Sequence, residues 1–232
     1  MTAFLKSHKF LKELQKGVQL MKTFVYPSAL QKQAMPPLKN AKGPTKNVII
    51  RYREMNGIKL TVLLPTLHNQ IKDSITAQAN DPATPPVVSL ILCHSQLRAA
   101  QMLEFTEELA QFCNEVVEVV NIDADQDEVI AKLTLINASG KTTAASEGMT
   151  FKKSVVLIGT PGNFSTLLAR KQYAAFNVAY HSVILDKLDL LQAMDFKEEI
   201  VEVANVLKEA QVSGKVIFTT NVRDEKDLSI EE

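Results

Sequence analysis

Apolar and polar residues alternate along the chain in blocks that fit buried strands and amphipathic helices in turn. Several short runs are almost wholly apolar, which is typical of strands buried on both faces of a sheet. The expected strands are Val48–Ile50, Val87–Cys93, Val116–Asn121, Ser154–Gly159, Ser182–Leu185 and Lys215–Thr219. Because helical segments separate most of these runs, the pattern predicts an α/β fold whose parallel sheet has right-handed crossovers.

Apolar residues recur at helical spacing between the strands. The expected helices are residues 3–22, Ser28–Leu38, a segment beginning at Leu60–Leu67, Ala99–Phe112, Phe164–Arg170 and Phe196–Gln211. We expect the second helix to stop at Pro36–Pro37, because proline removes a backbone donor. Residues 73–86 and 138–153 are polar and should form loops. The run Glu128–Ile136 fits either a helix or a strand.

The chain is long enough for one α/β domain with a sizeable core or for two small domains, since it has 232 residues. We expect a helical extension over residues 1–24, a single lobe over 25–222 and a polar tail over 223–232. Acidic and basic side chains balance, with 26 of each. A neutral chain argues modestly against nucleic-acid binding and leaves room for a local basic face.

Cys93 and Cys113 both lie in apolar runs, and neither stands at metal-ligand spacing from another cysteine or a histidine. They are expected to be buried thiols in a reducing, intracellular compartment, and no metal site is expected from them. No run of 18 apolar residues occurs, so no membrane span is expected.

Chemistry-bearing residues should follow the strands, because ligands of parallel sheets bind at the carboxyl ends of the strands. Six motifs stand out: PSALQ at Pro27–Gln31, REMNGIKL at Arg53–Leu60, HSQLRAAQ at His94–Gln101, TPGN at Thr160–Asn163, VILDKLDLLQAMDF at Val183–Phe196 and TTN at Thr219–Asn221. In order and spacing they resemble the motifs of the DEAD-box RNA helicases, over nearly the whole chain. The resemblance implies the first RecA-like lobe of that family, a P-loop NTPase-type parallel sheet with helices on both faces.

In the family's Q motif, a glutamine reads adenine by paired hydrogen bonds, since a carboxamide offers a donor and an acceptor. The resemblance assigns this contact to Gln31, with Pro27 at the start of the motif. Phe4 would be the upstream aromatic residue that packs on the base. The alternative is an ordinary helix start with an exposed glutamine.

The second motif occupies the position of the family's phosphate-binding loop, A-x-x-G-x-G-K-T. Lys59 matches the lysine, and Gly57 is a glycine in a different slot. Asn56 and Ile58 stand where the family has glycines, although glycines let backbone amides approach the phosphates. Leu60 replaces the threonine that holds Mg²⁺. The resemblance therefore predicts weakened binding of ATP and Mg²⁺.

The fifth motif resembles V-I-D-E-A-D, in which Asp186 and Asp189 keep the two aspartates. Lys187 replaces the glutamate that polarises the attacking water, and an ammonium group cannot act as that base. We expect Lys187 to bring positive charge to the magnesium site and to pair with Asp186. No catalytic residue is assigned, and Asp186 would hold Mg²⁺ if the ion binds.

The third and fourth motifs resemble the PTRELAxQ and TPGR elements that contact the RNA backbone in this family. Arginine is missing from both, which removes cationic contacts to phosphate. Backbone amides at a helix N-terminus can still receive a phosphate at TPGN, and the alternative there is a simple Pro-Gly turn. The residues that the resemblance assigns to the RNA backbone are Ser95, Gln96, Thr160, Pro161, Gly162 and Asn163.

The sixth motif stands where the family has Ser-Ala-Thr, which couples hydrolysis to unwinding. One hydroxyl is kept, and we expect the bridging geometry to be lost. The segments NFSTLLARKQ and DLLQAMDFKEEI also resemble the nucleolar subgroup that acts in large-subunit ribosome assembly.

The motif losses favour a degenerate, catalytically inactive lobe that acts as an RNA-binding or scaffold module in RNA or ribosome assembly, in the nucleus or nucleolus. One alternative is a divergent ATP-dependent helicase lobe that is active with a second RecA lobe, since the family's ATP lies between two lobes and the second supplies an arginine finger. The other is a protein–protein adaptor, favoured by the neutral charge and the missing arginines. Fold similarity alone does not decide between them.

Overall fold

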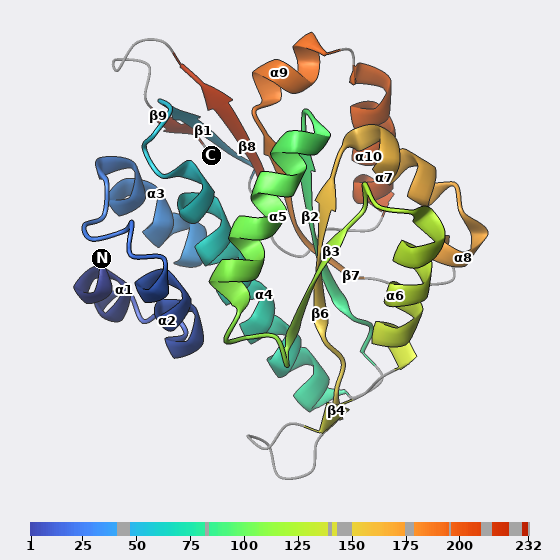
Figure 1. Cartoon of the computed structure of the whole chain (residues 1–232), viewed down its shortest axis with the longest axis horizontal. Helices are drawn as coiled ribbons and strands as arrows, with labels where there is room; N and C mark the ends of the chain where they lie inside the picture. Colours follow the sequence, from blue (N-terminus) through green and yellow to red (C-terminus); the bar gives the residue numbers. More distant parts are fainter. Residues whose placement is uncertain are drawn as a thin grey trace.

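The computed structural model describes residues 1–40, 47–81, 84–138, 141–142, 150–174, 179–194, 196–209, 215–222 and 229–231. Its centre is a seven-stranded sheet in the order β3-β6-β2-β7-β8-β1-β9 (Figure 1). The strands are β1 (Val48–Tyr52), β2 (Val87–Cys93), β3 (Val117–Asn121), β6 (Ser154–Gly159), β7 (Ala179–Asp186), β8 (Val216–Asn221) and β9 (Ser229–Glu231). Two further short strands, β4 (Lys141–Thr142) and β5 (Thr150–Phe151), pair with each other.

Every neighbouring pair in the large sheet is parallel except the pair of β9 with β1. The predicted parallel α/β sheet is therefore confirmed, and all six expected strands are present in it. Strand β9 lies within the segment expected as a polar tail, of which residues 223–228 and 232 lie outside the described part.

Helices cover both faces of the sheet (Figure 1). They are α1 (Thr2–Ser7), α2 (Lys12–Leu20), α3 (Ala29–Asn40), α4 (Ile58–Asn80), α5 (Gln96–Ala110), α6 (Gln126–Ala138), α7 (Pro161–Leu168), α8 (Lys171–Ala174), α9 (Leu188–Ala193) and α10 (Lys197–Glu209). The ambiguous run Glu128–Ile136 thus belongs to a helix, α6.

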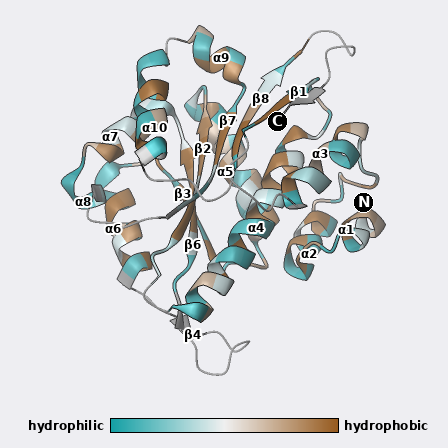
Figure 2. Ribbon diagram, turned by 180° about the vertical axis from the view of Figure 1, so that it is seen from behind, coloured by the Kyte–Doolittle hydropathy of each residue, from teal (hydrophilic) through white to brown (hydrophobic). Residues whose placement is uncertain are grey.

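Successive side chains of the central strands point to opposite faces of the sheet, so they contribute to two separate apolar cores. In β2, Ile91 and Cys93 pack into the core that also contains α1 to α5, whereas Leu90 and Leu92 pack into the core with α6, α7 and α10. Every residue of β2 is buried, including Ser89, as its almost wholly apolar run predicts. Figure 2 shows the result as hydrophobic colour concentrated in the strands and on the inner sides of the helices.

The expected single helix over residues 3–22 is wrong, because the chain breaks between α1 and α2. Lys9 has a positive φ of 53° there, and the following Phe10 is buried. Leu11 donates its backbone N–H to Nδ1 of His68 at 3.2 Å, and His68 lies in the middle of α4. Tertiary contact with α4 therefore decides this break, which apolar spacing alone did not indicate.

Two expected helix ends are also wrong. Helix α3 continues through Pro36 and Pro37 to Asn40, and it packs against α4. Helix α4 runs on to Asn80, although residues 73–86 were expected to be a loop. The polar residue Gln78 is buried there and holds both backbone groups of Lys152, accepting from its N–H at 2.6 Å and donating to its carbonyl at 3.0 Å. Buried polar bonds thus replace the apolar periodicity that usually marks a helix.

Both cysteines are free and buried, as predicted. No helix among the described residues is long and apolar enough to cross a membrane.

Candidate functional site

A cavity of about 320 Å³ lies where the loop between β1 and α4 approaches the carboxyl end of β7. Its wall includes Gly57 and Lys59 from the start of α4, Arg98 from α5 and Lys187 from the residue after β7. This is the edge of the sheet at which ligands of parallel α/β proteins bind. The motifs taken as the phosphate loop and the acidic motif therefore meet at one cavity.

Gly57 caps the N-terminus of α4 in the left-handed conformation, with φ of 74°. A Cβ at this position would lie 2.4 Å from Nε2 of Gln31, so the backbone needs glycine here for both φ and space. Met55, in the same loop, also has a positive φ, of 68°, and its side chain is fully exposed. The loop is thus tightly turned, but it carries one glycine where the family's loop has two.

Gln31 is buried, so the alternative of an exposed glutamine is wrong. Its Oε1 accepts from the N–H of Ser28 at 2.9 Å, and its Nε2 donates to the carbonyl of Gly57 at 3.3 Å. Both ends of the amide therefore hold the chain's own backbone, and Pro27 lies partly buried just before this contact. The adenine contact of Gln31 remains a prediction.

The aromatic residue on the cavity wall is Phe24, whose ring lies 6.0 Å from that of Phe105 in an edge-on arrangement. Phe4, which the resemblance suggested for base packing, instead packs on His8, the residue that follows α1, with 4.3 Å between the ring centres, and it is not part of the cavity wall. Sequence reasoning missed Phe24. Its position three residues before Pro27 is the signal that could have indicated it.

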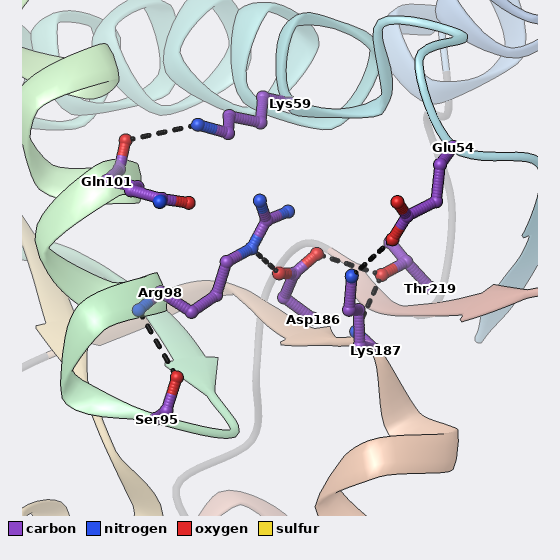
Figure 3. Close-up of polar contacts among 8 residues, drawn as sticks. All are labelled: Glu54, Lys59, Ser95, Arg98, Gln101, Asp186, Lys187 and Thr219. Carbon is purple, nitrogen blue, oxygen red and sulfur yellow. Dashed lines mark hydrogen bonds and ion pairs between the residues drawn. The ribbon is translucent and has the colours of Figure 1, made fainter.

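Asp186 is fully buried, and both of its carboxylate oxygens have partners (Figure 3). Nε of Arg98 donates to Oδ2 at 2.6 Å, and Oγ1 of Thr219 donates to Oδ1 at 3.1 Å. Burial opposes the charge of Arg98, but its hydrogen bond to Asp186 and the attraction of that carboxylate leave its pKa raised. The result is a buried, hydrogen-bonded ion pair beside the cavity.

Arg98 was not among the predicted site residues. In the alignment with PTRELAxQ it stands at the leucine, which gave no reason to expect a charged contact. Ser95 caps α5 by accepting from the N–H of Arg98 at 3.3 Å, so the same motif fixes the start of the helix that carries the arginine. Gln96 is exposed on the first turn of α5.

Lys187 does not pair with Asp186, contrary to expectation. Its Nζ donates to Oε1 of Glu54 at 2.6 Å, and this hydrogen bond, with the charge of Lys187, lowers the pKa of Glu54. The backbone N–H of Lys187 is held by Oγ1 of Thr219 at 2.9 Å, in a left-handed conformation with φ of 57°. Asp186 is already paired with Arg98, and the ammonium group of Lys187 pairs with Glu54 instead; Lys187 and Glu54 both line the cavity.

The expected loss of bridging at TTN is wrong. Thr219 links Asp186 to the backbone of Lys187, while Thr220 and Asn221 both donate to Oδ1 of Asp189, at 3.3 and 3.4 Å. Strand β8 therefore still holds both aspartates of the acidic motif.

Lys59 lies on the cavity wall, as its match to the phosphate-loop lysine suggested. Its Nζ donates to the carbonyl of Gln101 at 3.4 Å and lies 5.6 Å from the ring centre of Phe105. Burial lowers its pKa, and the nearby charge of Arg98 lowers it further.

Mg²⁺ does not fit these residues as they are arranged. Both oxygens of Asp186 are engaged, one of them by a cation, and Leu60 offers no ligand where the family has a threonine. Among the described residues, no group of three or more His, Cys, Asp or Glu side chains could hold a metal ion. Mg²⁺ at nucleotide sites needs only one or two protein oxygens besides water and substrate phosphates, and here the aspartate is engaged and the threonine is missing.

The TPGN motif lies at the start of α7, and Asp123, which follows β3, accepts three hydrogen bonds from Thr160 and Asn163 through one oxygen. Oδ1 of Asp123 accepts from the N–H of Thr160 at 2.8 Å, from its Oγ1 at 2.9 Å and from Nδ2 of Asn163 at 2.8 Å. Pro161 is the first residue of α7, and Gly162 faces open space. Nothing in the sequence motif indicated Asp123.

The sheet order, the turn into α4 and the acidic motif at the end of β7 define a RecA-like lobe of the P-loop type. A model of the DEAD/DEAH box helicase family matches residues 28–227, and the chain belongs to this family. The resemblance suggested by the motifs is therefore confirmed.

Two solved structures show the shared fold. The chain is similar to the DEAD-box helicase Mss116 bound to ssRNA and UDP-BeF, with a TM-score of 0.67 and 15% identity, over 96% of this chain and 40% of that one. It is also similar to S. cerevisiae Dbp5 bound to RNA and ADP BeF3, with a TM-score of 0.62 and 18% identity, over 96% of this chain and 47% of the other.

Two curated relatives are ATP-dependent RNA helicase DBP9 of Kluyveromyces lactis and ATP-dependent rRNA helicase spb-4 of Neurospora crassa. The first is 22% identical over 184 residues, 79% of this chain, and the second is 24% identical over 211 residues, 87% of this chain. The chain spans only 27% and 30% of the lengths of these two relatives.

Proposed function

We propose that this chain is a catalytically inactive DEAD-box lobe that serves as an RNA-binding or scaffold module in RNA or ribosome assembly. The observation that carries this proposal is the ion pair of Arg98 with Asp186, 2.6 Å long and inaccessible on the carboxylate side. In the family motif this aspartate would hold Mg²⁺. Here the carboxylate is already neutralised by the chain itself.

Two further features support the loss of hydrolysis. A base that polarises water is absent from the acidic motif, since Lys187 stands in its place and points to Glu54. Leu60 removes the hydroxyl ligand expected on the phosphate loop. Restoring catalysis would therefore need several changes in one cavity rather than one.

The RNA and assembly parts of the proposal rest on the relatives. Both are named as RNA helicases, one of them as an rRNA helicase, and two similar structures contain RNA. The proposed role in ribosome assembly is the reason for proposing a location in the nucleus or nucleolus. Residues 25–222 would be the lobe that docks, with residues 1–24 as a helical extension and residues 223–232 as a tail.

A second candidate function is a protein–protein adaptor that uses the fold without RNA. Asp123 favours the adaptor function. Its carboxylate already accepts the hydrogen bonds of Thr160 and Asn163, and its negative charge would repel an approaching phosphate. The neutral net charge of the chain agrees with this alternative.

ATP hydrolysis by the purified chain tests the loss of catalysis. We expect no turnover above background with Mg²⁺, with or without single-stranded RNA. Because the family's ATP lies between two lobes, the assay is run with the chain alone and with a second RecA lobe of a family member added. Turnover in the mixture that disappears in Lys59→Ala would contradict the proposal and would favour a divergent helicase lobe that works with a second RecA lobe.

Fluorescence anisotropy with a labelled single-stranded RNA separates the two candidates. RNA binding should be insensitive to sequence and should weaken as salt increases, because backbone contacts release counterions. Failure to bind at low salt would instead support the adaptor, with protein partners as the next search.

A further inference from the structure

Helix α4 presents an uncapped N-terminus to the cavity. Its N-cap, Gly57, makes no side-chain hydrogen bond, and the first turn holds no acidic residue. Residues 57–60 all lie on the cavity wall. The N-terminus of a long helix carries partial positive charge and free backbone donors, so it favours an anion.

Tyr52 provides a second and independent indication of a ligand. The side chain lines the cavity and is only 1% exposed, yet its hydroxyl has no hydrogen-bond partner among the described residues. Burial and the charge of Asp186 raise the pKa of Tyr52, so the hydroxyl keeps its proton and can donate. A buried donor without a partner is unfavourable unless a ligand or water accepts from it.

Arg98 and Lys59 bring two cationic groups to the same cavity. Arg98 uses Nε for Asp186, and Figure 3 shows its terminal nitrogens on the side that faces Lys59. Both side chains line the cavity, and Lys187 at its mouth is paired with Glu54. An anion between Lys59 and Arg98 would relieve the repulsion between them and would accept charge-assisted hydrogen bonds.

We propose that this cavity binds a diphosphate group without magnesium, with the guanidinium of Arg98 in the place of the divalent cation. The inference rests on the proposed loss of the magnesium site and adds a ligand to it. Free diphosphate carries the negative charge that Lys59, Arg98 and the start of α4 can neutralise. Diphosphate chelated by Mg²⁺ has lost part of that charge, and the ion would meet Arg98. Magnesium should therefore oppose binding.

The diphosphate could be inorganic pyrophosphate or part of a nucleotide. Gln31 does not line the cavity, and each end of its amide already holds a backbone group, of Ser28 or of Gly57. Recognition of the phosphates alone is therefore the expectation. Pyrophosphate, ADP and GDP should bind within a few-fold of one another if the phosphates alone are recognised. A clear preference for ADP over both others would identify a nucleotide as the source.

Isothermal titration of the full chain with pyrophosphate tests the proposal, first in EDTA and then in excess MgCl₂. We expect pyrophosphate to bind in EDTA. In excess MgCl₂ its affinity should be about tenfold lower, as the loss of a charge-assisted hydrogen bond implies. Tyr52→Phe removes one hydroxyl without leaving a buried charge and should weaken binding about fivefold. Lys59→Gln should weaken it by about tenfold or more. Tyr26→Phe, at a side chain that is 84% exposed, is the matched control and should bind as wild type.

Three results would overturn the proposal: no heat with millimolar pyrophosphate in EDTA, tighter binding in magnesium than in EDTA, or unchanged binding in both Tyr52→Phe and Lys59→Gln. Absent binding together with absent ATP hydrolysis would remove this inference and leave the proposed function standing. Magnesium-dependent ATP hydrolysis would remove both.

Discussion

The carboxyl edge of the sheet has two halves, at the ends of β7 and β6, and the side chain that binds the motif residues carries opposite charge in the two halves. At the end of β7, the acidic motif residue Asp186 is neutralised by a cation, Arg98. At the end of β6, the donors of Thr160 and Asn163 are met by a carboxylate, Asp123. Each half of the expected helicase site is thus satisfied from within the chain. The comparison teaches that residues of a family motif can be present while another side chain of the same protein occupies the position of their expected ligand.

The two halves also differ in what remains available to a ligand. The first half keeps a cavity lined by cationic and neutral donors, among them Lys59 and Tyr52. The second half holds an acidic oxygen without a partner, since Oδ2 of Asp123 is buried and unbonded in the described part of the chain. We therefore expect an anion to bind at the first half more readily than at the second.

Replacement of Arg98 should have the largest effect. Arg98→Leu leaves Asp186 buried without its cation, which should reduce the free energy of unfolding by about 3–5 kcal/mol. Urea unfolding measures this change, and Arg170→Leu, at an exposed arginine on the second half, is the matched control. The double variant Arg98→Leu/Asp186→Asn should recover more than half of the loss. No recovery would mean that Arg98 stabilises the fold by packing rather than by charge.

Acidification should destabilise the packing of the N-terminal helices on α4, next to the first half. Burial, with the charges of Lys39 and Lys72, lowers the pKa of His68 to about 4 from its usual 6.5. The unfolded chain therefore binds a proton more readily, so stability falls as the pH drops below 6.5 and stops falling near 4. The expected loss from this group is about 3 kcal/mol.

His68 accepts the N–H of Leu11, so its protonation should loosen the N-terminal helices that precede Phe24 on the cavity wall. Unfolding measured against pH in wild type and in His68→Gln gives the difference that belongs to this side chain. Equal pH slopes in the two proteins would exclude His68 as the cause.

Removal of the negative charge at the second half should open it to RNA. Asp123→Asn keeps one oxygen as acceptor but removes the charge that repels phosphate, and RNA affinity at low salt should rise about five- to tenfold. Asp127→Asn removes the same charge from a side chain that is 84% exposed and should change affinity much less. If fluorescence anisotropy shows the same change in RNA affinity for both substitutions, only the net charge matters, and the two halves do not differ in this respect.

The pair at the mouth of the cavity should matter least. Lys187 and Glu54 are joined at 2.6 Å, but 60% of the Glu54 side chain is exposed. Lys187→Gln should therefore change the free energy of unfolding by less than about 1 kcal/mol. A larger loss in urea unfolding would mean that this pair closes the loop between β1 and α4.

The fold was predictable because its signal is local. Buried strands such as Val87–Cys93 are apolar at every position except Ser89, and short runs of this kind are typical of strands buried on both faces of a sheet. Helix ends were less predictable. Helix α4 keeps its last turns through Gln78, whose partner Lys152 lies 74 residues away along the chain.

The sequence by itself determined the parallel sheet, the order of the motifs and the family, because these depend on residue types at fixed spacing. It also located Lys59 and Asp186 at one edge. Only the tertiary structure decided which partners these groups have. Arg98 is 88 residues from Asp186, and Asp123 is 37 residues from Thr160. Charge pairing depends on distance in space, and no spacing rule along a chain encodes it.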